Sequence, residues 1–209
     1  MISPALEKPV VYLVDDDDSF RKAVTRLLHT AGYNVRAYRT AGDFVLASRE
    51  NRRGCVLLDV RMPGPGGLDL QKALGKEAEP LPVIFLTAHG DVPISVQAMK
   101  AGAADFLTKP VKRDVLLTAI RMALARDQRI HTSHELRHEL RTRFERLTAR
   151  EREVFDLVVA GKLNKQIAVE LGMAERTVKA HRAQVMTKMR ATSLAELVHF
   201  ADEIQSEPT

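Results

Sequence analysis

The sequence predicts two domains of different class: a doubly wound α/β domain with a five-stranded parallel sheet, followed by a small all-α domain. Three observations support this prediction. Short β-type runs alternate with helical segments from Val10 to about Arg121. Most of these runs are continuously apolar, as in strands that are buried on both faces of a parallel sheet. After Arg121 the strand signal disappears, and 209 residues are enough for two small domains.

The five expected strands are separated by amphipathic segments. Arg21–Leu28 is one such segment, with Ala23, Val24, Leu27 and Leu28 at helical spacing. Strand and helix that alternate in this way imply right-handed βαβ crossovers and an open sheet. We expect the strands at Val10–Val14, Asn34–Tyr38, Cys55–Leu58, Val83–Leu86 and Ala104–Leu107.

The charged segment Arg126–Arg146 joins the two halves. Leu136, Leu140, Phe144 and Leu147 fall at helical spacing, and the segment contains no Pro or Gly. These features favour a linker helix that continues the last helix of the first domain, and the alternative is a flexible charged tether. We therefore place the domains at 1–125 and 147–209, with the linker helix at 126–146.

The C-terminal half reads as short helices. Thr148 and Glu151 have the spacing of a capping box, in which each side chain binds the other residue's backbone N–H. Gly161 and Gly172 interrupt the helical pattern. Helices are expected from about Asn164, from about Glu175 to Met189, and from about Ser193 to Ile204.

Composition narrows the function classes. The chain has a single cysteine, Cys55, which fits a reducing compartment, and no apolar stretch approaches the roughly 20 residues of a membrane span. The first residues lack the pattern of a signal peptide. The expected protein is cytoplasmic and soluble, with no membrane partner.

The net charge of +5 is local. Between Val158 and Thr192 seven basic residues are opposed by two glutamates, whereas four aspartates, Asp15 to Asp18, follow the first strand. A basic segment favours an anionic partner such as nucleic acid.

Polar residues follow several of the expected strands. Asp15 and Asp16 come after the first, Asp59 after the third, Thr87 after the fourth, and Thr108 and Lys109 after the fifth. In a doubly wound sheet these positions share the rim where ligands bind. The sequence thus predicts three carboxylates, a hydroxyl and an ammonium in one site.

Clustered carboxylates need a cation, and hard oxygen ligands suit Mg2+. A carboxylate beside such a cation can act as a nucleophile that accepts a phosphoryl group. Asp59 stands alone after the central strand and is the best candidate, whereas Asp15 and Asp16 resemble a metal-binding pair. We interpret Asp17 and Asp18 as capping the following helix. The glycine-rich stretch 64–67 lacks the lysine of a phosphate-binding loop and predicts a mobile turn.

Four motifs, "VDDD", "LLDVRMPGPGG", "FLTAHGDVP" and "AGAADFLTKP", together resemble the receiver domain of bacterial response regulators, a flavodoxin-like fold. The resemblance implies that Asp59 accepts phosphate from a sensor histidine kinase. It also implies that Mg2+ is held by Asp16, Asp59 and the backbone carbonyl of Arg61, with Asp15 acting through water.

The same resemblance assigns further roles. Lys109 pairs with the phosphoryl oxygens, and the Lys109–Pro110 bond is cis. Thr87 and Phe106 form a switch pair. Arg61 and His89 match positions that tune the loss of phosphate.

Residues 164–189 have helix-turn-helix spacing, which offers the second helix to the major groove. Val178, Val185 and Met189 form its inward stripe, and His181 borders that stripe in a structural role. Without other information, a helical bundle with a solvated basic face remains the alternative. The expected DNA-binding residues are Lys165, Arg176, Thr177, Lys179 and Arg182, of which Lys165, Thr177 and Arg182 suit phosphate contacts.

Leu147–Phe200 resembles the LuxR-type DNA-binding domain in "LTARE", "GKLNKQIA", "TVKAHR" and "SLAELVHF". A receiver joined to this domain resembles the FixJ/NarL class of response regulators and is most FixJ-like. Ala183 departs from relatives that carry a basic residue there, which weakens any transferred DNA site. The resemblance implies a transcription regulator that is not a metabolic enzyme. Its expected partners are a histidine kinase, a second copy when phosphorylated, a two-fold DNA operator and RNA polymerase.

Three other functions remain open on the residues alone. The first is a Mg2+-dependent phosphohydrolase, which would need a second aspartate where Arg61 stands. The second is a DNA-binding protein with a vestigial phosphorylation site. The third is an output domain that binds a protein rather than DNA.

Overall fold

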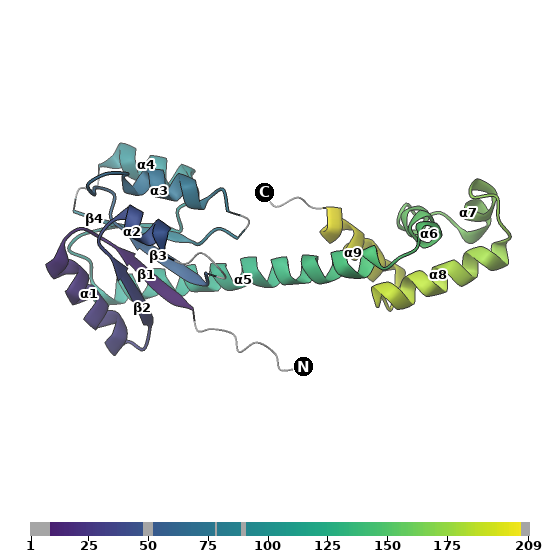
Figure 1. Ribbon diagram of the computed structural model, residues 1–209, viewed down its shortest axis with the longest axis horizontal. Coiled ribbons are helices and arrows are strands. Elements are labelled where there is room, and N and C mark those ends of the chain that lie inside the picture. Colours follow the sequence, from purple (N-terminus) through teal and green to yellow (C-terminus); the bar gives the residue numbers. More distant parts are fainter. Residues whose placement is uncertain (1–8, 48–51, 78, 89–90, 206–209) are drawn as a thin grey trace. The chain divides into compact units, whose positions relative to one another are not determined.

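The computed structural model describes residues 9–47, 52–77, 79–88 and 91–205 (Figure 1). Strands and helices alternate as expected up to α5. The elements of this part are β1 (Val10–Val14), α1 (Asp18–Thr30), β2 (Asn34–Tyr38), α2 (Ala41–Leu46), β3 (Gly54–Leu58), α3 (Gly67–Leu74), β4 (Val83–Thr87), α4 (Val92–Lys100), β5 (Asp105–Thr108) and α5 (Arg113–Glu145).

The five strands form one parallel sheet in the order β2-β1-β3-β4-β5. The order reverses between β1 and β3, so this is the topological switch point at which ligands bind in doubly wound folds. The expected strand ends differ from the observed ones by at most one residue. Thr87 and Thr108 are the last residues of β4 and β5 rather than the first residues after them.

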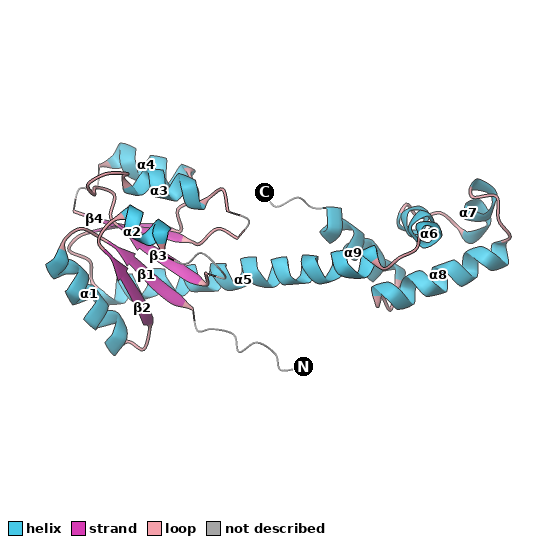
Figure 2. Ribbon diagram, viewed as in Figure 1, coloured by secondary structure: helices cyan, strands magenta, loops and turns pink. Residues whose placement is uncertain are grey.

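Helices flank the sheet (Figure 2), and two layers of buried apolar side chains join them to it. On one face, Phe44 of α2, Leu70 of α3 and Ala98 of α4 pack against the even-numbered residues of β1 and β3. On the other face, Leu28 of α1 and Ile120 of α5 pack against the odd-numbered ones. The central strands β1, β3 and β4 are buried throughout, which explains their continuously apolar sequences.

Cys55 lies in the second of these layers and is fully buried. Burial raises the pKa of its thiol to about 12. A thiol of this kind is neither a nucleophile nor a metal ligand at neutral pH.

Helix α5 is continuous from Arg113 to Glu145 (Figure 1). The expected linker is therefore helical, and it continues the last helix of the α/β part. Contacts within the chain divide it into two units between His131 and Thr132, inside α5. None of the described helices is both long and apolar enough to cross a bilayer.

The second unit is helical. Thr148 and Glu151 form the expected capping box at the start of its first complete helix. Leu140 near the end of α5 and Leu147 just after it are buried in the same core as Phe155, Val185 and Phe200. After α5 its helices are α6 (Ala149–Val159), α7 (Asn164–Glu170), α8 (Glu175–Met189) and α9 (Leu194–Gln205).

Candidate functional site

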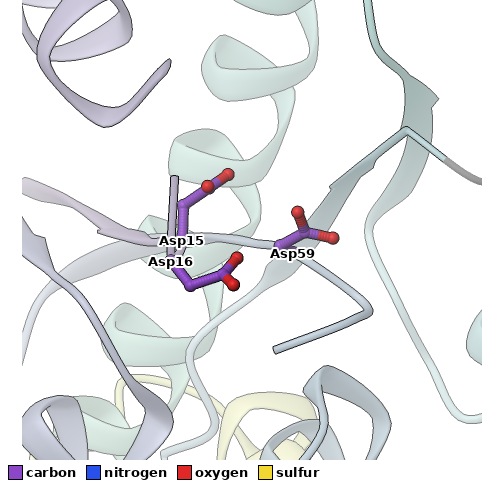
Figure 3. A group of neighbouring side chains, drawn as sticks. All are labelled: Asp15, Asp16 and Asp59. Carbon is purple, nitrogen blue, oxygen red and sulfur yellow. The ribbon is translucent and has the colours of Figure 1, made fainter. Parts of the chain in front are cut away.

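Three carboxylates meet at the carboxyl ends of β1 and β3. Asp15 and Asp16 follow β1, and Asp59 follows β3. Each offers a ligand oxygen, and these oxygens lie within 4.8 Å of one another (Figure 3). Asp15 and Asp59 are buried, whereas Asp16 is exposed. The predicted convergence of these aspartates is therefore confirmed by the geometry.

Lys109, which follows β5, completes the group. Its Nζ donates to Asp15 Oδ2 at 2.6 Å and to Asp59 Oδ2 at 2.7 Å. Its backbone N–H donates to the carbonyl of Thr87 at 2.8 Å, which ties the ends of β4 and β5 together. The Lys109–Pro110 bond is cis, as the sequence resemblance implied.

The ion pairs of Lys109 with Asp15 and Asp59 affect the pKa values of Asp15 and Lys109. Burial raises the pKa of Asp15, and the hydrogen bond and charge of Lys109 oppose that rise. For Lys109 itself, burial lowers the pKa, but its hydrogen bonds to Asp15 and Asp59 outweigh this effect and the pKa is raised. Lys109 is thus a cation at neutral pH, positioned between two carboxylates.

The donor set fits a divalent cation. The three carboxylates are hard oxygen ligands, and among the described residues the one side-chain cation that pairs with them is Lys109, which binds Asp15 and Asp59. The exposed carboxylate of Asp16 has no partner among the described residues, so it is available to a cation. The Arg61 N–H donates to Asp59 Oδ1 at 3.2 Å, which places the Arg61 backbone beside this cluster.

The second candidate surface is on α7 and α8. Val178, Val185 and Met189 are fully buried, as their spacing predicts. His181 is half-buried beside them. The opposite face of α8 and the start of α7 are solvent-exposed and carry most of the predicted DNA-binding side chains: Lys165, Arg176, Thr177 and Lys179.

Arg182 differs from this group because it is half-buried. Its Nη1 donates to Asn164 Oδ1 at 3.1 Å, which joins α8 to the first residue of α7. Lys179 carries an ion pair with Glu175 at 3.2 Å on the exposed helix surface. The surface is therefore a basic face on a packed helix pair, of the kind that enters a DNA groove.

Both parts of the chain match known families. Residues 11–121 match the family "Response regulator receiver domain", and residues 145–201 match "Bacterial regulatory proteins, luxR family". The chain belongs to the response-regulator family. Its LuxR-type domain makes it a transcription regulator rather than a metabolic enzyme.

Similar proteins support this membership over nearly the whole response regulator. This chain is 42% identical to nodulation protein W of Bradyrhizobium diazoefficiens, over 96% of this chain and 88% of that protein. It is 44% identical to transcriptional regulatory protein FixJ of Azorhizobium caulinodans over 91% of this chain and 90% of FixJ. The structure of response regulator StyR matches with a TM-score of 0.82 and 44% identity, over 94% of this chain and 99% of that one.

The predicted switch residues of this response regulator lie on the neighbouring strands β4 and β5. Thr87 is buried at the end of β4. Phe106 of β5 is half-buried, and its ring centroid lies 5.9 Å from that of Phe85 on β4. His89 lies outside the described residues.

Asp17 and Asp18 have different roles, and the interpretation of both as caps is wrong for Asp18. Asp17 is the N-cap of α1, and its side chain accepts from the N–H groups of Ser19 and Phe20. Asp18 is the first helical residue, and its carboxylate pairs with Arg21 and Lys22 on the surface. Two adjacent residues cannot occupy one cap position, so only Asp17 binds the free amides.

Three site residues were not predicted. The Phe20 ring lies 4.1 Å from Lys109 Nζ in a cation–π contact, and Arg21 Nη1 donates to the Asp15 carbonyl at 2.7 Å. Gly67 lies against the backbone of Asp59, where an added Cβ would be 2.3 Å from the Asp59 carbonyl oxygen. Gly67 is therefore a packed residue of the site and the first residue of α3 rather than part of a turn.

Arg61 occupies the position where the competing phosphohydrolase would need its second catalytic aspartate. That chemistry would need a second acidic side chain two residues after Asp59. The side chain of Arg61 is instead exposed and pairs with Asp91 at 3.3 Å.

Proposed function

We propose that Asp59 is the phosphoacceptor of this response regulator and that its phosphorylation switches DNA binding. A carboxylate oxygen of Asp59 attacks phosphorus, the bond between phosphorus and a kinase histidine breaks, and the histidine nitrogen keeps the electron pair. The observation that supports this best is the position of Lys109 Nζ, 2.7 Å from Asp59 Oδ2. A cation at this distance can pair with the oxygens of an incoming phosphoryl group.

The divalent cation of the site is proposed to be Mg2+, held by Asp16, Asp59 and the backbone carbonyl of Arg61, with Asp15 acting through water. When bound, Mg2+ neutralises charge on the carboxylates and on the phosphoryl oxygens. The exposure of Asp16 supports this proposal, since that carboxylate is accessible to a hydrated ion. Lys109 then serves to hold Asp15 and Asp59 in place in the absence of the ion.

Thr87 and Phe106 are proposed to relay the phosphorylation state. A phosphoryl group on Asp59 offers a new acceptor to the Thr87 hydroxyl, and its movement leaves space that Phe106 can fill. Only contacts that differ between the two states can shift the equilibrium between them. The half-buried position of Phe106 beside Phe85 is compatible with movement in either direction.

The output is proposed to be a homodimer on a two-fold DNA operator, formed when Asp59 is phosphorylated. Lys165, Arg176, Thr177, Lys179 and Arg182 would contact DNA, and two α8 helices would read two half-sites. RNA polymerase is the proposed downstream partner. Since its proposed partner is the bacterial genome, the protein would act in the cytoplasm.

The decisive experiment compares Asp59→Asn with Asp69→Asn, a matched change at an exposed carboxylate on α3. Phosphorylation by a small acyl phosphate in Mg2+ is followed by intact-protein mass, and genome-wide DNA binding is measured in cells. Asp59→Asn is expected to abolish the mass increase and to reduce occupancy at operators, whereas Asp69→Asn behaves as wild type. Persistent labelling of Asp59→Asn at another residue would overturn the assignment.

A further inference from the structure

A groove lies at the edge of the sheet, between α1 and β2, and it shares Arg21 with the carboxylate site. Its volume is about 460 Å3. Helix α1 and strand β2 lie side by side at this edge (Figure 1). The groove is lined by Asp18, Arg21, Lys22, Thr25, Arg26 and His29 of α1 and by Ala37 of β2.

The hollow exists because Ala37 is small. Val35 and Ala37 point to the same side of the sheet, since side chains alternate along a strand. Val35 packs into the apolar layer beneath α1. Ala37 is exposed, and its methyl group leaves uncovered the space that a larger side chain would fill.

Basic residues form a stripe along the α1 wall of the groove. Lys22, Arg26 and His29 are spaced at helical intervals and all are exposed. The single acidic lining residue, Asp18, is already paired with Arg21 and Lys22. Within the described part of the chain, neither Arg26 nor His29 has an ion-pair partner, so the guanidinium charge of Arg26 faces solvent.

The β2 wall offers backbone groups. Within the described residues β2 pairs only with β1, so its other edge presents free N–H and C=O groups. The Thr25 hydroxyl oxygen is buried in this region with no partner among the described residues. Other helical threonines, such as Thr30 and Thr187, donate to the carbonyl four residues earlier.

We propose that this groove binds an extended acidic segment of a partner protein, which adds to the edge of β2. Alternate residues of a strand are about 6.6 Å apart, close to the axial rise of about 6 Å between Lys22 and Arg26. Carboxylates at alternate positions therefore meet successive cations of α1 while the peptide backbone pairs with β2. A nucleotide fits less well, because the lining has no Phe, Tyr or Trp ring on which a base could stack, and its only carboxylate is already paired.

The test uses a fluorescein-labelled ten-residue peptide in which glutamate alternates with threonine, and the full chain. A second peptide has the same composition with its glutamates in one block. Binding is measured by fluorescence anisotropy, and protection of the β2 amides is measured by hydrogen exchange. The alternating peptide is expected to bind about tenfold more tightly than the block peptide and to protect β2.

Two variants locate the site. Ala37→Leu fills the hollow, and the double variant Arg26→Ala/His29→Ala removes the two basic side chains that have no ion-pair partner among the described residues, so each is expected to weaken binding about tenfold. Lys72→Ala, at an exposed cation of α3 on the other face of the sheet, is the matched control and should bind as wild type. Phosphorylation by an acyl phosphate should be unchanged in all three, which shows that they fold and separates this proposal from the function of Asp59.

Equal affinity for the two peptides would mean that they bind by general charge attraction alone, and it would overturn the proposal. Lack of protection at β2 would do the same. A single-stranded oligonucleotide of equal charge that displaces the peptide and itself protects β2 would assign the groove to nucleic acid instead.

Discussion

The two units of this response regulator handle charge in opposite ways. In the α/β unit the important charges are buried and come from distant parts of the chain: Lys109 pairs with Asp15 and Asp59 across 94 and 50 residues. On the predicted DNA-binding face of the helical unit they are exposed and local, as in Lys179 paired with Glu175 one turn away. The first arrangement depends on the whole fold, whereas the second depends on the surface of one helix. Removing a charge should therefore cost stability in one unit and mainly binding in the other.

The largest effect is expected for Lys109→Met. This change leaves Asp15 and Asp59 buried side by side without a counter-charge, which should lower the free energy of unfolding of the α/β unit by about 3 kcal/mol in a chelator. Added Mg2+ should restore part of this loss, because it supplies the missing positive charge. All three tyrosines, Tyr12, Tyr33 and Tyr38, lie in this unit, and the chain has no tryptophan. Tyrosine fluorescence during urea unfolding therefore reports on it alone.

The corresponding change in the helical unit, Lys188→Met, serves as control for Lys109. Lys188 pairs with the buried carboxylate of Glu151 but is itself partly exposed. The Lys188→Met substitution should leave the tyrosine-detected unfolding transition of the α/β unit unchanged. If Lys109→Met unfolds at the wild-type urea concentration in the chelator, the buried pairs do not stabilise the unit as argued.

A smaller effect is expected for Gly67→Ala, which places a methyl group 2.3 Å from the Asp59 carbonyl oxygen. The Asp59 backbone and the buried Phe85 ring cannot yield easily, so the free energy of unfolding should fall by about 2 kcal/mol. Phosphorylation should also slow, because Asp59 must shift. Gly172→Ala in the helical unit is the matched comparison: its Cβ meets open space, and only its φ of +63° resists the change, at a cost of about 1 kcal/mol. Equal losses in the two variants would contradict the packing argument.

These contacts mark what the sequence could and could not predict. The rim of strand ends was predictable, because the carboxyl ends of parallel strands share one edge whatever the loop lengths are. The inward stripe of α8 was predictable from helical period alone. Phe20, Arg21 and Gly67 were missed because their roles arise from approach in space. A phenylalanine and an arginine at the start of a helix look like ordinary helix residues, and Gly67 looks like part of a turn.

The position of the boundary between the two units could not be predicted from the sequence pattern either. A charged segment without Pro or Gly predicts a helix, and the segment is helical. Whether its apolar residues serve a linker or a core depends on what they meet. Leu140 is fully buried in the core of the helical unit, whereas Leu136, one turn earlier, is 37% exposed. The proposed domain limits thus remain a prediction that proteolysis near His131 can test.

A third effect, of about 1 kcal/mol, is expected for Glu151→Gln. Hydrogen bonds from Lys188 and from the Thr148 N–H lower the pKa of Glu151 in the folded state. A carboxyl whose pKa is lowered on folding contributes stability that is present above its unfolded pKa, about 4.3. That stability is lost as the pH falls through the folded pKa. The variant should therefore make the acid unfolding of the helical unit less steep below about pH 4.3, as hydrogen exchange of α6 amides can show. An unchanged acid transition in Glu151→Gln would show that Glu151 does not contribute to it.

The smallest effect on stability is expected for Lys179→Ala, because its ion pair with Glu175 is exposed on both sides. The free energy of unfolding should stay within about 0.5 kcal/mol of wild type. Binding to operator DNA should nevertheless weaken, and the slope of log affinity against log salt should fall by about 1, as for the loss of one phosphate contact. Arg150→Ala, an exposed cation at the start of α6 that pairs with Glu153, is the control and should leave the slope unchanged. A fall in stability without a change in slope would mean that Lys179 supports its helix rather than binding DNA, and the contrast between the two units would lose its clearest case.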